Sequence, residues 1–228
     1  MTLWFERLTP SGFPVADVRR FLRDVGRPDT LRHVSRVAAV GRRLARRFGV
    51  PLAQSDLACT AHDLAAVVPL RNVLAAAEAL GVPLTEADRA IPQVVHGPVA
   101  AAVLRVQLRI DDEDVLNAVW YHTTLRAGAR PLEMLAFIAD KLAYDPTARD
   151  VSYHPALTAA RDTASLPGLC FIYLDWAVRE GPRLGWRLHL RRERRFCAPP
   201  SQSSTNRHVA RNPVRFGRIG RCALSKPP

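Results

Sequence analysis

Apolar residues recur at helical spacing over most of the chain, from about Val15 to about Arg179. They return at steps of three and four residues, which places them on one face of a helix. Stretches that alternate between apolar and polar residues, as strands do, are missing from this span. The pattern therefore predicts an all-α body in which Gly and Pro mark the helix ends.

The segment that begins at His33 shows this pattern clearly. Val37, Val40 and Leu44 follow His33 at steps of four, three and four, while another face carries Arg32, Arg36, Arg43 and Arg47. Such a segment is an amphipathic helix, and His33 is predicted on its buried side. Gly49 and Pro51 then close this helix and start the next.

Further helices are predicted by the same spacing and by their end signals. Thr85 with Asp88 resembles a capping box, Asp112 is a plausible N-cap, and Pro131 suits a first helical turn. The predicted helices run through Leu57 and Ala61 to His62 and Asp63, over 69–80, from Gly97-Pro98 to about 109, over 113–122, from Pro131 through Asp140, and from Pro155 onward, including 169–178.

Charge divides the chain of 228 residues into two parts. Lys and Arg number 33 against 21 Asp and Glu, but residues 183–228 hold 12 of the basic residues and a single acid, Glu193. Residues 1–182 are therefore nearly neutral. The C-terminal part is rich in Arg, Ser and Pro and poor in large apolar residues, which is typical of disorder. We expect a domain over 1–182 and a basic, disordered tail over 183–228.

The four cysteines lie far apart and form no CxxC pair that could start a zinc or redox site. This spacing favours a reducing, cytoplasmic setting. No run of 18 apolar residues occurs, and the first residues lack a basic start followed by an apolar stretch. We therefore expect a cytoplasmic protein that does not span a membrane.

Six polar residues interrupt the apolar faces of the predicted helices. Asp140, for example, follows Ala136 and Phe137 and precedes Ala143. A buried carboxylate is costly unless a charge, a hydrogen-bond network or a metal offsets it. The six are His33, His62, Asp63, His96, His122 and Asp140.

Imidazole and carboxylate ligands suit first-row divalent metals, and six ligands are too many for one tetrahedral site. The set therefore predicts a centre with two divalent metal ions. His62 and Asp63 are neighbours whose side chains diverge by about 100° on a helix, so the carboxylate can bridge toward a second ion. The alternative for each histidine taken alone is a hydrogen-bonded place in the core.

The order H, HD, H, H, D resembles the HD-domain metal-dependent phosphohydrolases. Within them it is most similar to the YqeK-type group, the symmetrical bis(5'-nucleosyl)-tetraphosphatases. The resemblance covers about residues 15–180 and excludes the tail. The motifs that carry it are RHVSRV at 32–37, AHDLA at 61–65, VVHGPVAA at 94–101, AVWYHTT at 118–124 and IADK at 138–141.

The resemblance implies an HD-domain helical bundle that hydrolyses diadenosine tetraphosphate to two ADP. It implies two metal ions, usually iron, with manganese or another first-row metal as the alternative. It assigns His33, His62, Asp63 and Asp140 to one ion. Asp63 would bridge to a second ion held by His96 and His122, and His62 and Asp63 would lie at the catalytic centre.

A polyphosphate substrate also needs cations and hydrogen-bond donors around its oxygens. Arg126, Arg130, Lys141 and Thr123 lie close in sequence to the expected ligands and are the substrate-binding candidates. The alternative for the three cations is a solvated surface position. For Thr123 the alternative is a helix cap.

Three departures from the family pattern bear on the substrate. Ala66 stands where Lys is frequent, Leu125 where Gly commonly follows HTT, and Ala143 where Glu is frequent. Another nucleotide, such as (p)ppGpp or a deoxynucleotide, is therefore an alternative substrate. A further alternative is a non-catalytic protein that binds RNA through the Arg-rich tail. The sequence leaves open whether the chain forms a homodimer.

Overall fold

The computed structural model describes residues 3–143, 163–184, 187–191 and 221–225. Most of the described chain is α-helical, with short 3-10 helices (η) between the α-helices. The helices are η1 (Leu3–Phe5), α1 (Pro14–Asp24), α2 (Pro28–Phe48), α3 (Leu52–Ala61), η2 (Leu64–Val67), η3 (Leu70–Asn72), α4 (Val73–Ala79), α5 (Glu86–Ala90), η4 (Pro92–Val95), α6 (His96–Gln107), α7 (Glu113–Tyr121), α8 (Pro131–Leu142), α10 (Leu166–Glu180) and η6 (Gly181–Leu184).

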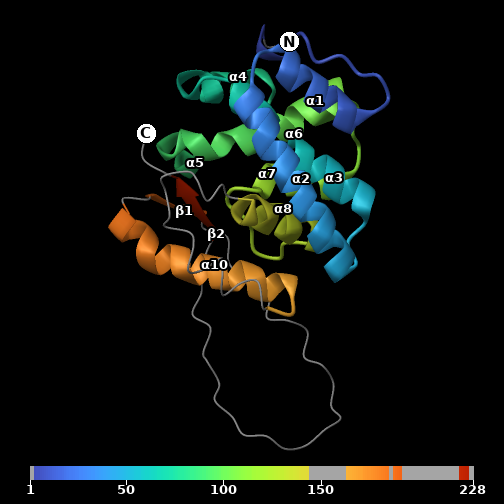
Figure 1. Cartoon of the computed structure of the whole chain (residues 1–228). Coiled ribbons are helices and arrows are strands. Elements are labelled where there is room, and N and C mark those ends of the chain that lie inside the picture. Colours follow the sequence, from blue (N-terminus) through green and yellow to red (C-terminus); the bar gives the residue numbers. More distant parts are fainter. Residues whose placement is uncertain (1–2, 144–162, 185–186, 192–220, 226–228) are drawn as a thin grey trace, which may run out of the picture.

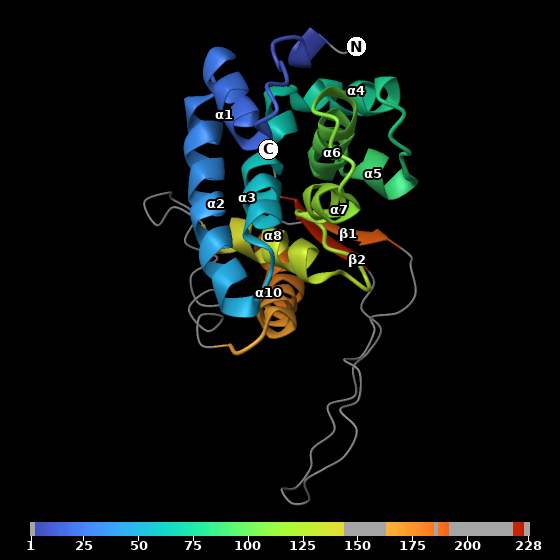
Figure 2. The same cartoon turned by 90° about the vertical axis from the view of Figure 1, so that its right-hand side faces the viewer.

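The 21-residue helix α2 runs along one side of the bundle, and α3 and α8 pack against it (Figures 1 and 2). Helix α7 contacts α3, α6 and α8 and so joins the two sides of the bundle. Helix α10 lies beneath α8, where Tyr173 meets Phe137 edge to face at 5.6 Å between ring centroids. Helices α2, α3, α6, α7 and α8 surround the centre described below.

Two glycines allow pairs of helices to approach closely in this arrangement. A side chain at Gly41 of α2 would lie 2.5 Å from the Sγ atom of Cys59 on α3. A side chain at Gly97 of α6 would lie 2.8 Å from the carbonyl oxygen of Trp120 on α7. Both distances are too short for real contacts, so each glycine allows its two helices to pack closely. The first contact holds α2 against α3, and the second holds α6 against α7.

The predicted all-α body is confirmed. The helix predicted to run through His62 and Asp63 ends earlier, at Ala61, while several other predicted helix ends match in detail. Thr85 and Asp88 form a capping box at α5, and Asp112 caps α7 by accepting hydrogen bonds from two backbone N–H groups. Pro131 opens α8, and 169–178 lies within α10. The prediction at Pro155 falls outside the described residues. Among the described helices, none is both long enough and apolar enough to cross a bilayer.

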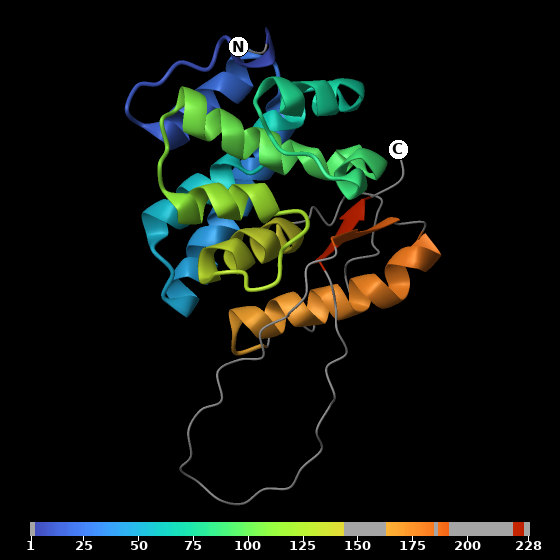
Figure 3. The ribbon, with the colours of Figure 1, turned by 180° about the vertical axis from the view of Figure 1, so that it is seen from behind.

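The C-terminal part differs from the predicted disordered tail at two described segments. Strands β1 (Arg187–Arg191) and β2 (Arg221–Ser225) form an antiparallel pair in which His189 is opposite Ala223. Figure 3 shows this ribbon between α5 and α10. The sequence signal was present, because Leu188 and Leu190 alternate with polar residues as in a strand. The division into 1–182 and 183–228 stays a prediction.

Candidate metal centre

The six residues that interrupt the apolar faces converge in the structure. They come from five places in the chain: the first part of α2, the two residues after α3, the start of α6, the residue after α7 and the last turns of α8. Two groups within the described residues meet the distance requirement for holding a metal ion. One comprises His33, His62 and Asp140, and the other comprises His62, Asp63 and His122.

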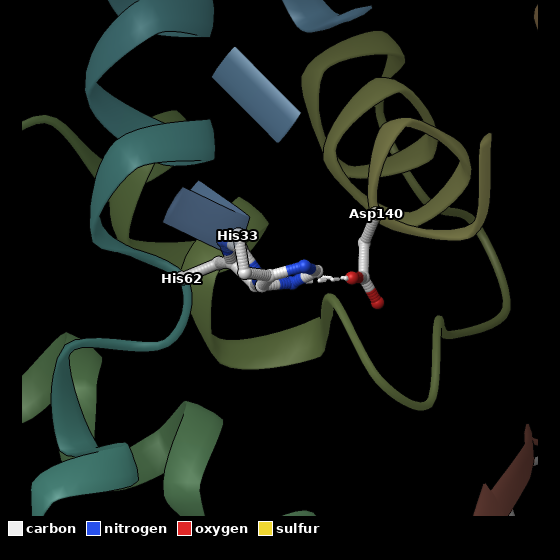
Figure 4. Close-up of side chains that lie close together, drawn as sticks. All are labelled: His33, His62 and Asp140. Atoms are coloured by element: carbon white, nitrogen blue, oxygen red, sulfur yellow. Dashed lines mark hydrogen bonds and ion pairs between the residues drawn. The ribbon is translucent and has the colours of Figure 1, made fainter. Parts of the chain in front are cut away.

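The first half of the centre gathers around Asp140. Its Oδ1 atom lies 3.0 Å from Nε2 of His33 and 3.7 Å from Nε2 of His62. The two Nε2 atoms are 3.1 Å apart. Figure 4 shows both imidazole rings, from α2 and from the residue after α3, with their nitrogen edges turned toward the Asp140 carboxylate on α8.

The second half pairs His96 with His122, whose Nε2 atoms are 2.9 Å apart. Asp63 joins the two halves because its oxygens face opposite ways. Its Oδ1 atom lies 3.1 Å from Nε2 of His96 and 3.6 Å from Nε2 of His122. Its Oδ2 atom lies 3.5 Å from Nε2 of both His33 and His62. One carboxylate therefore reaches both groups of imidazoles.

Backbone carbonyls fix three of the four imidazoles. The Nδ1 atoms of His62, His96 and His122 each donate to the carbonyl three residues earlier, at 2.9, 2.5 and 2.8 Å. For His62 and His122 that carbonyl lies in the last turn of a helix, where it has no helical partner. The chain thus uses each helix end to set the ring orientation of the residue that follows.

These bonds make the centre suited to a cation. Because the Nδ1–H groups of His96 and His122 donate to carbonyls, each ring in its neutral form presents a lone pair at the facing Nε2 atom. Two lone pairs at 2.9 Å repel each other unless a positive charge lies beside both of them. A divalent metal fits this donor set, in which backbone-anchored imidazoles and ionised carboxylates meet.

The pKa values of the cluster point the same way. Burial lowers the pKa of His122 to about 4, with the neighbouring His62 and His96 adding to the effect. Burial also disfavours the charged form of His62, but Asp63 and Asp140 outweigh it and raise this pKa to about 9. Burial acts to raise the pKa of both aspartates, yet Lys141 and the histidines hold these values well below the usual range. The carboxylates of Asp63 and Asp140 are therefore ionised, and a bound cation would balance their negative charge.

The four substrate-binding candidates separate into two pairs in space. Thr123 lies at the centre, with its Oγ1 atom 3.0 Å from Nε2 of His122. Lys141 also lies there, because its Nζ atom is 2.6 Å from Oδ2 of Asp140. Arg126 instead makes an ion pair with Glu133, and Arg130 makes an exposed one with Asp114. The structure thus brings Thr123 and Lys141 to the six-residue cluster and ties both arginines to other carboxylates.

Glu133 is a residue that the sequence reasoning missed. It is 1% exposed, and its carboxylate accepts two hydrogen bonds from Arg126 and one from the Arg130 backbone N–H. A signal for it existed in the sequence, since Glu133, Phe137 and Asp140 are spaced four and three residues apart. That spacing puts Glu133 on the same face of α8 as Asp140.

The family departure at Leu125 falls at a special backbone position. Leu125 has φ of 51°, in the left-handed region that favours glycine, and its side chain is buried. Its backbone N–H donates to the Tyr121 carbonyl at 2.7 Å and so ends α7. Ala66 is exposed and Ala143 is buried. Neither alanine belongs to the six-residue cluster.

A helical bundle whose core gathers histidines and aspartates in metal-binding groups defines a metal-dependent phosphohydrolase of the HD type. The chain belongs to the HD domain family, whose model matches residues 30–145. This stretch includes all six residues of the cluster. The resemblance read from the sequence motifs is thereby confirmed.

Similarity to individual proteins extends over part of the chain. A Bacillus subtilis protein named "Bis(5'-nucleosyl)-tetraphosphatase, symmetrical" is 32% identical over 99 residues, which cover 42% of this chain and 52% of that protein. An uncharacterized Lactococcus lactis protein is 27% identical over 61% of this chain and 72% of its own length. The chain therefore matches about half the length of the Bacillus enzyme.

A solved structure confirms the fold. It is a predicted HD superfamily hydrolase involved in NAD metabolism from Clostridium acetobutylicum, with a TM-score of 0.66. The two chains are 23% identical, and the likeness covers 75% of this chain and 88% of that one. At this level of identity the comparison supports the fold alone.

Proposed function

We propose that this chain hydrolyses dinucleoside polyphosphates and cleaves diadenosine tetraphosphate symmetrically into two ADP. The observation that carries the proposal is the position of Asp63, whose two oxygens face two separate groups of imidazoles. The similarity to the Bacillus enzyme named as a symmetrical tetraphosphatase supports the choice of substrate.

The residues fit two divalent ions. His33, His62, Asp63 and Asp140 would hold one, and Asp63 with His96 and His122 would hold the second. Iron is the metal in this proposal, with manganese or another first-row ion as the alternative. Such ions, when bound, supply Lewis-acid activation of water and neutralise charge on the phosphoryl oxygens.

The chain contributes orientation, charge and hydrogen bonding around that chemistry. Asp63 and Asp140 hold negative charge at fixed points, and the backbone bonds of His62 and His122 keep the Nε2 atoms turned inward. The Thr123 hydroxyl lies beside His122, where it can donate a hydrogen bond to a phosphoryl oxygen. The Lys141 ammonium lies beside Asp140 and adds positive charge near a polyphosphate.

The test is hydrolysis of diadenosine tetraphosphate by protein purified without chelator, with the nucleotide products separated and the metal content measured on the same sample. ADP as the sole product, with about two metals per chain, supports the proposal. ATP and AMP in equal amounts would show asymmetric cleavage and contradict it. Metal without any cleavage of this substrate would also contradict it.

A second candidate is hydrolysis of another nucleotide, such as (p)ppGpp or a deoxynucleotide. It is favoured by Ala66, which is exposed one turn after Asp63 at a position where the family pattern has a lysine. Removing a cation there weakens the case for a long polyphosphate. A nucleotide panel run beside the first assay separates the two candidates by the preferred substrate.

A further inference from the structure

The loop between α7 and α8 carries Thr123 near its start and is anchored three residues later by a partly buried ion pair. Arg126 donates from Nε and Nη2 to the two oxygens of Glu133, at 2.6 and 2.7 Å. The guanidinium also lies over the Tyr121 ring, 4.7 Å from its centroid. The loop is thus fastened both to the start of α8 and to the end of α7.

Glu133 is bound on several sides. Its side chain is 0% exposed, whereas that of Arg126 is 25% exposed. The Arg130 N–H donates to the same carboxylate at 3.2 Å, which also caps α8. A buried carboxylate bound by a two-pronged guanidinium and a backbone N–H is held in one geometry.

Backbone geometry transmits this constraint to Thr123. Between Thr123 and Arg126 the chain passes through the left-handed Leu125, and Ala129 N–H donates back to the Arg126 carbonyl at 3.3 Å. Only Thr124 and Leu125 separate Thr123 from Arg126, and both are buried. A shift of the Arg126 backbone therefore moves the Thr123 hydroxyl relative to Nε2 of His122.

We propose that Arg126 and Glu133 form a positioning pair that holds the Thr123 hydroxyl against the metal centre, and that Arg126 does not bind the substrate directly. The proposal rests on the proposed phosphohydrolase function for its kinetic consequence. Its structural basis is the bidentate pair, the buried Glu133 and the short, constrained path from Arg126 to Thr123.

The first experiment measures backbone hydrogen exchange across 123–130 in metal-free and metal-loaded protein. Glu133→Gln keeps the shape and one oxygen acceptor but removes the charge, so exchange in this loop is expected to speed up in both states. The matched control is Glu113→Gln, which breaks the exposed ion pair between Arg105 and Glu113 on α6 and α7. The control is expected to leave exchange at 123–130 unchanged.

The second experiment is a double-mutant cycle with Thr123→Val, read as kcat and KM. Loss of a hydrogen bond to the reacting phosphoryl group is expected to lower kcat about 100-fold in the wild-type background. In the Glu133→Gln background the same change is expected to cost less than about 5-fold, because the hydroxyl is already displaced. In the Glu113→Gln background it is expected to keep its full effect.

Additive effects of Thr123→Val and Glu133→Gln would overturn the proposal, since a role in stability alone leaves the Thr123 contribution intact. Unchanged exchange at 123–130 would overturn it as well. Should Glu133→Gln fail to fold, Arg126→Lys replaces it, because Lys keeps the charge but loses the two-pronged geometry.

The wild type is first tested on the nucleotide panel and on generic phosphodiesters such as bis(p-nitrophenyl) phosphate. The double-mutant cycle is then run on the substrate that it hydrolyses fastest. Preference for a substrate other than diadenosine tetraphosphate would overturn the proposed substrate. The double-mutant cycle on the preferred substrate would still decide the role of the pair. Hydrolysis of no substrate at all would overturn the proposed function, and hydrogen exchange at 123–130 would then decide the role of the pair.

Discussion

Asp63 is the residue on which the two halves of the centre depend. Its Oδ2 atom faces His33 and His62, and its Oδ1 atom faces His96 and His122. Among the carboxylates of the described residues, only that of Asp63 makes an ion pair within 4 Å with all four imidazole Nε2 atoms. A change at this position acts on both groups at once.

We expect Asp63→Asn to lose metal from both halves, because the amide keeps the shape but not the charge. Loss of a residue that hydrogen-bonds to a metal ligand typically lowers metal affinity or activity by roughly 10- to 100-fold. Turnover of Asp63→Asn should fall by more than this. The measurement is metal content per chain together with turnover. Retention of two metals with normal turnover would contradict the bridging role. The control is Asp56→Asn, which alters an ion pair with Arg42 outside the cluster.

Leu125 allows the cost of a strained backbone to be separated from that of a buried side chain. We expect Leu125→Ala to lower the free energy of unfolding by about 3 kcal/mol, because it empties a buried site and keeps the left-handed φ. Leu125→Gly loses slightly more side chain but relieves the backbone, so it should be more stable than the alanine variant by about 1 kcal/mol. Urea unfolding of both variants gives the comparison, and a glycine variant less stable than the alanine variant would contradict it.

At the scale of elements, α7 is the helix that connects the two sides of the bundle. Its N-cap, Asp112, accepts from the N–H groups of Asp114 and Val115 at 3.0 and 3.2 Å. The same carboxylate also accepts a hydrogen bond from the side-chain amide of Gln54 on α3, at 2.6 Å. Burial acts to raise the pKa of Asp112, but these hydrogen bonds outweigh it and the pKa is lowered.

We expect Asp112→Ala to lower the free energy of unfolding by about 1 kcal/mol at neutral pH. Because the folded-state pKa is depressed, this stabilisation is present above the ordinary value of 3.8 and is lost as the pH falls through the folded-state value. The gap between wild type and Asp112→Ala should therefore shrink in acid. Denaturant unfolding at neutral and acidic pH measures it, and Asp112→Asn, which keeps a capping oxygen, should lose less at neutral pH.

Helix α8 illustrates what element periodicity can and cannot predict. The steps of four and three from Glu133 to Phe137 to Asp140 place all three on one face, which the sequence shows. Periodicity does not say which cation meets which carboxylate. That Arg126 meets Glu133, and Arg130 meets Asp114, depends on how the loop before α8 turns.

At the scale of the whole molecule, the metal-binding groups and the basic excess occupy different parts of the chain. All six cluster residues lie between His33 and Asp140, whereas 12 of the 33 basic residues lie in 183–228. Hydrolysis and any binding of RNA by the Arg-rich tail are therefore separable by truncation.

We expect a chain lacking residues 193–228 to keep its metal content and turnover within about twofold, since no cluster residue is removed. If the tail binds RNA, the same truncation should abolish a salt-sensitive association that the full chain shows. Filter binding at several salt concentrations measures the second effect. A large loss of turnover on truncation would show that the C-terminal segment contributes to the site.

The sequence by itself determined several of the helix ends, the buried faces and the identity of the six clustered residues. These follow from local rules: caps and prolines act within one turn, and a polar residue on an apolar face is visible from spacing alone. Only the tertiary structure decided that Asp63 faces both groups of imidazoles, that Arg126 is tied to Glu133 and that Thr123 and Lys141 lie at the centre. The Asp63 contacts join helices far apart in the chain and depend on close helix packing at positions such as Gly41 and Gly97. The contacts of Arg126, Thr123 and Lys141 are close in sequence and depend on how the loop before α8 turns.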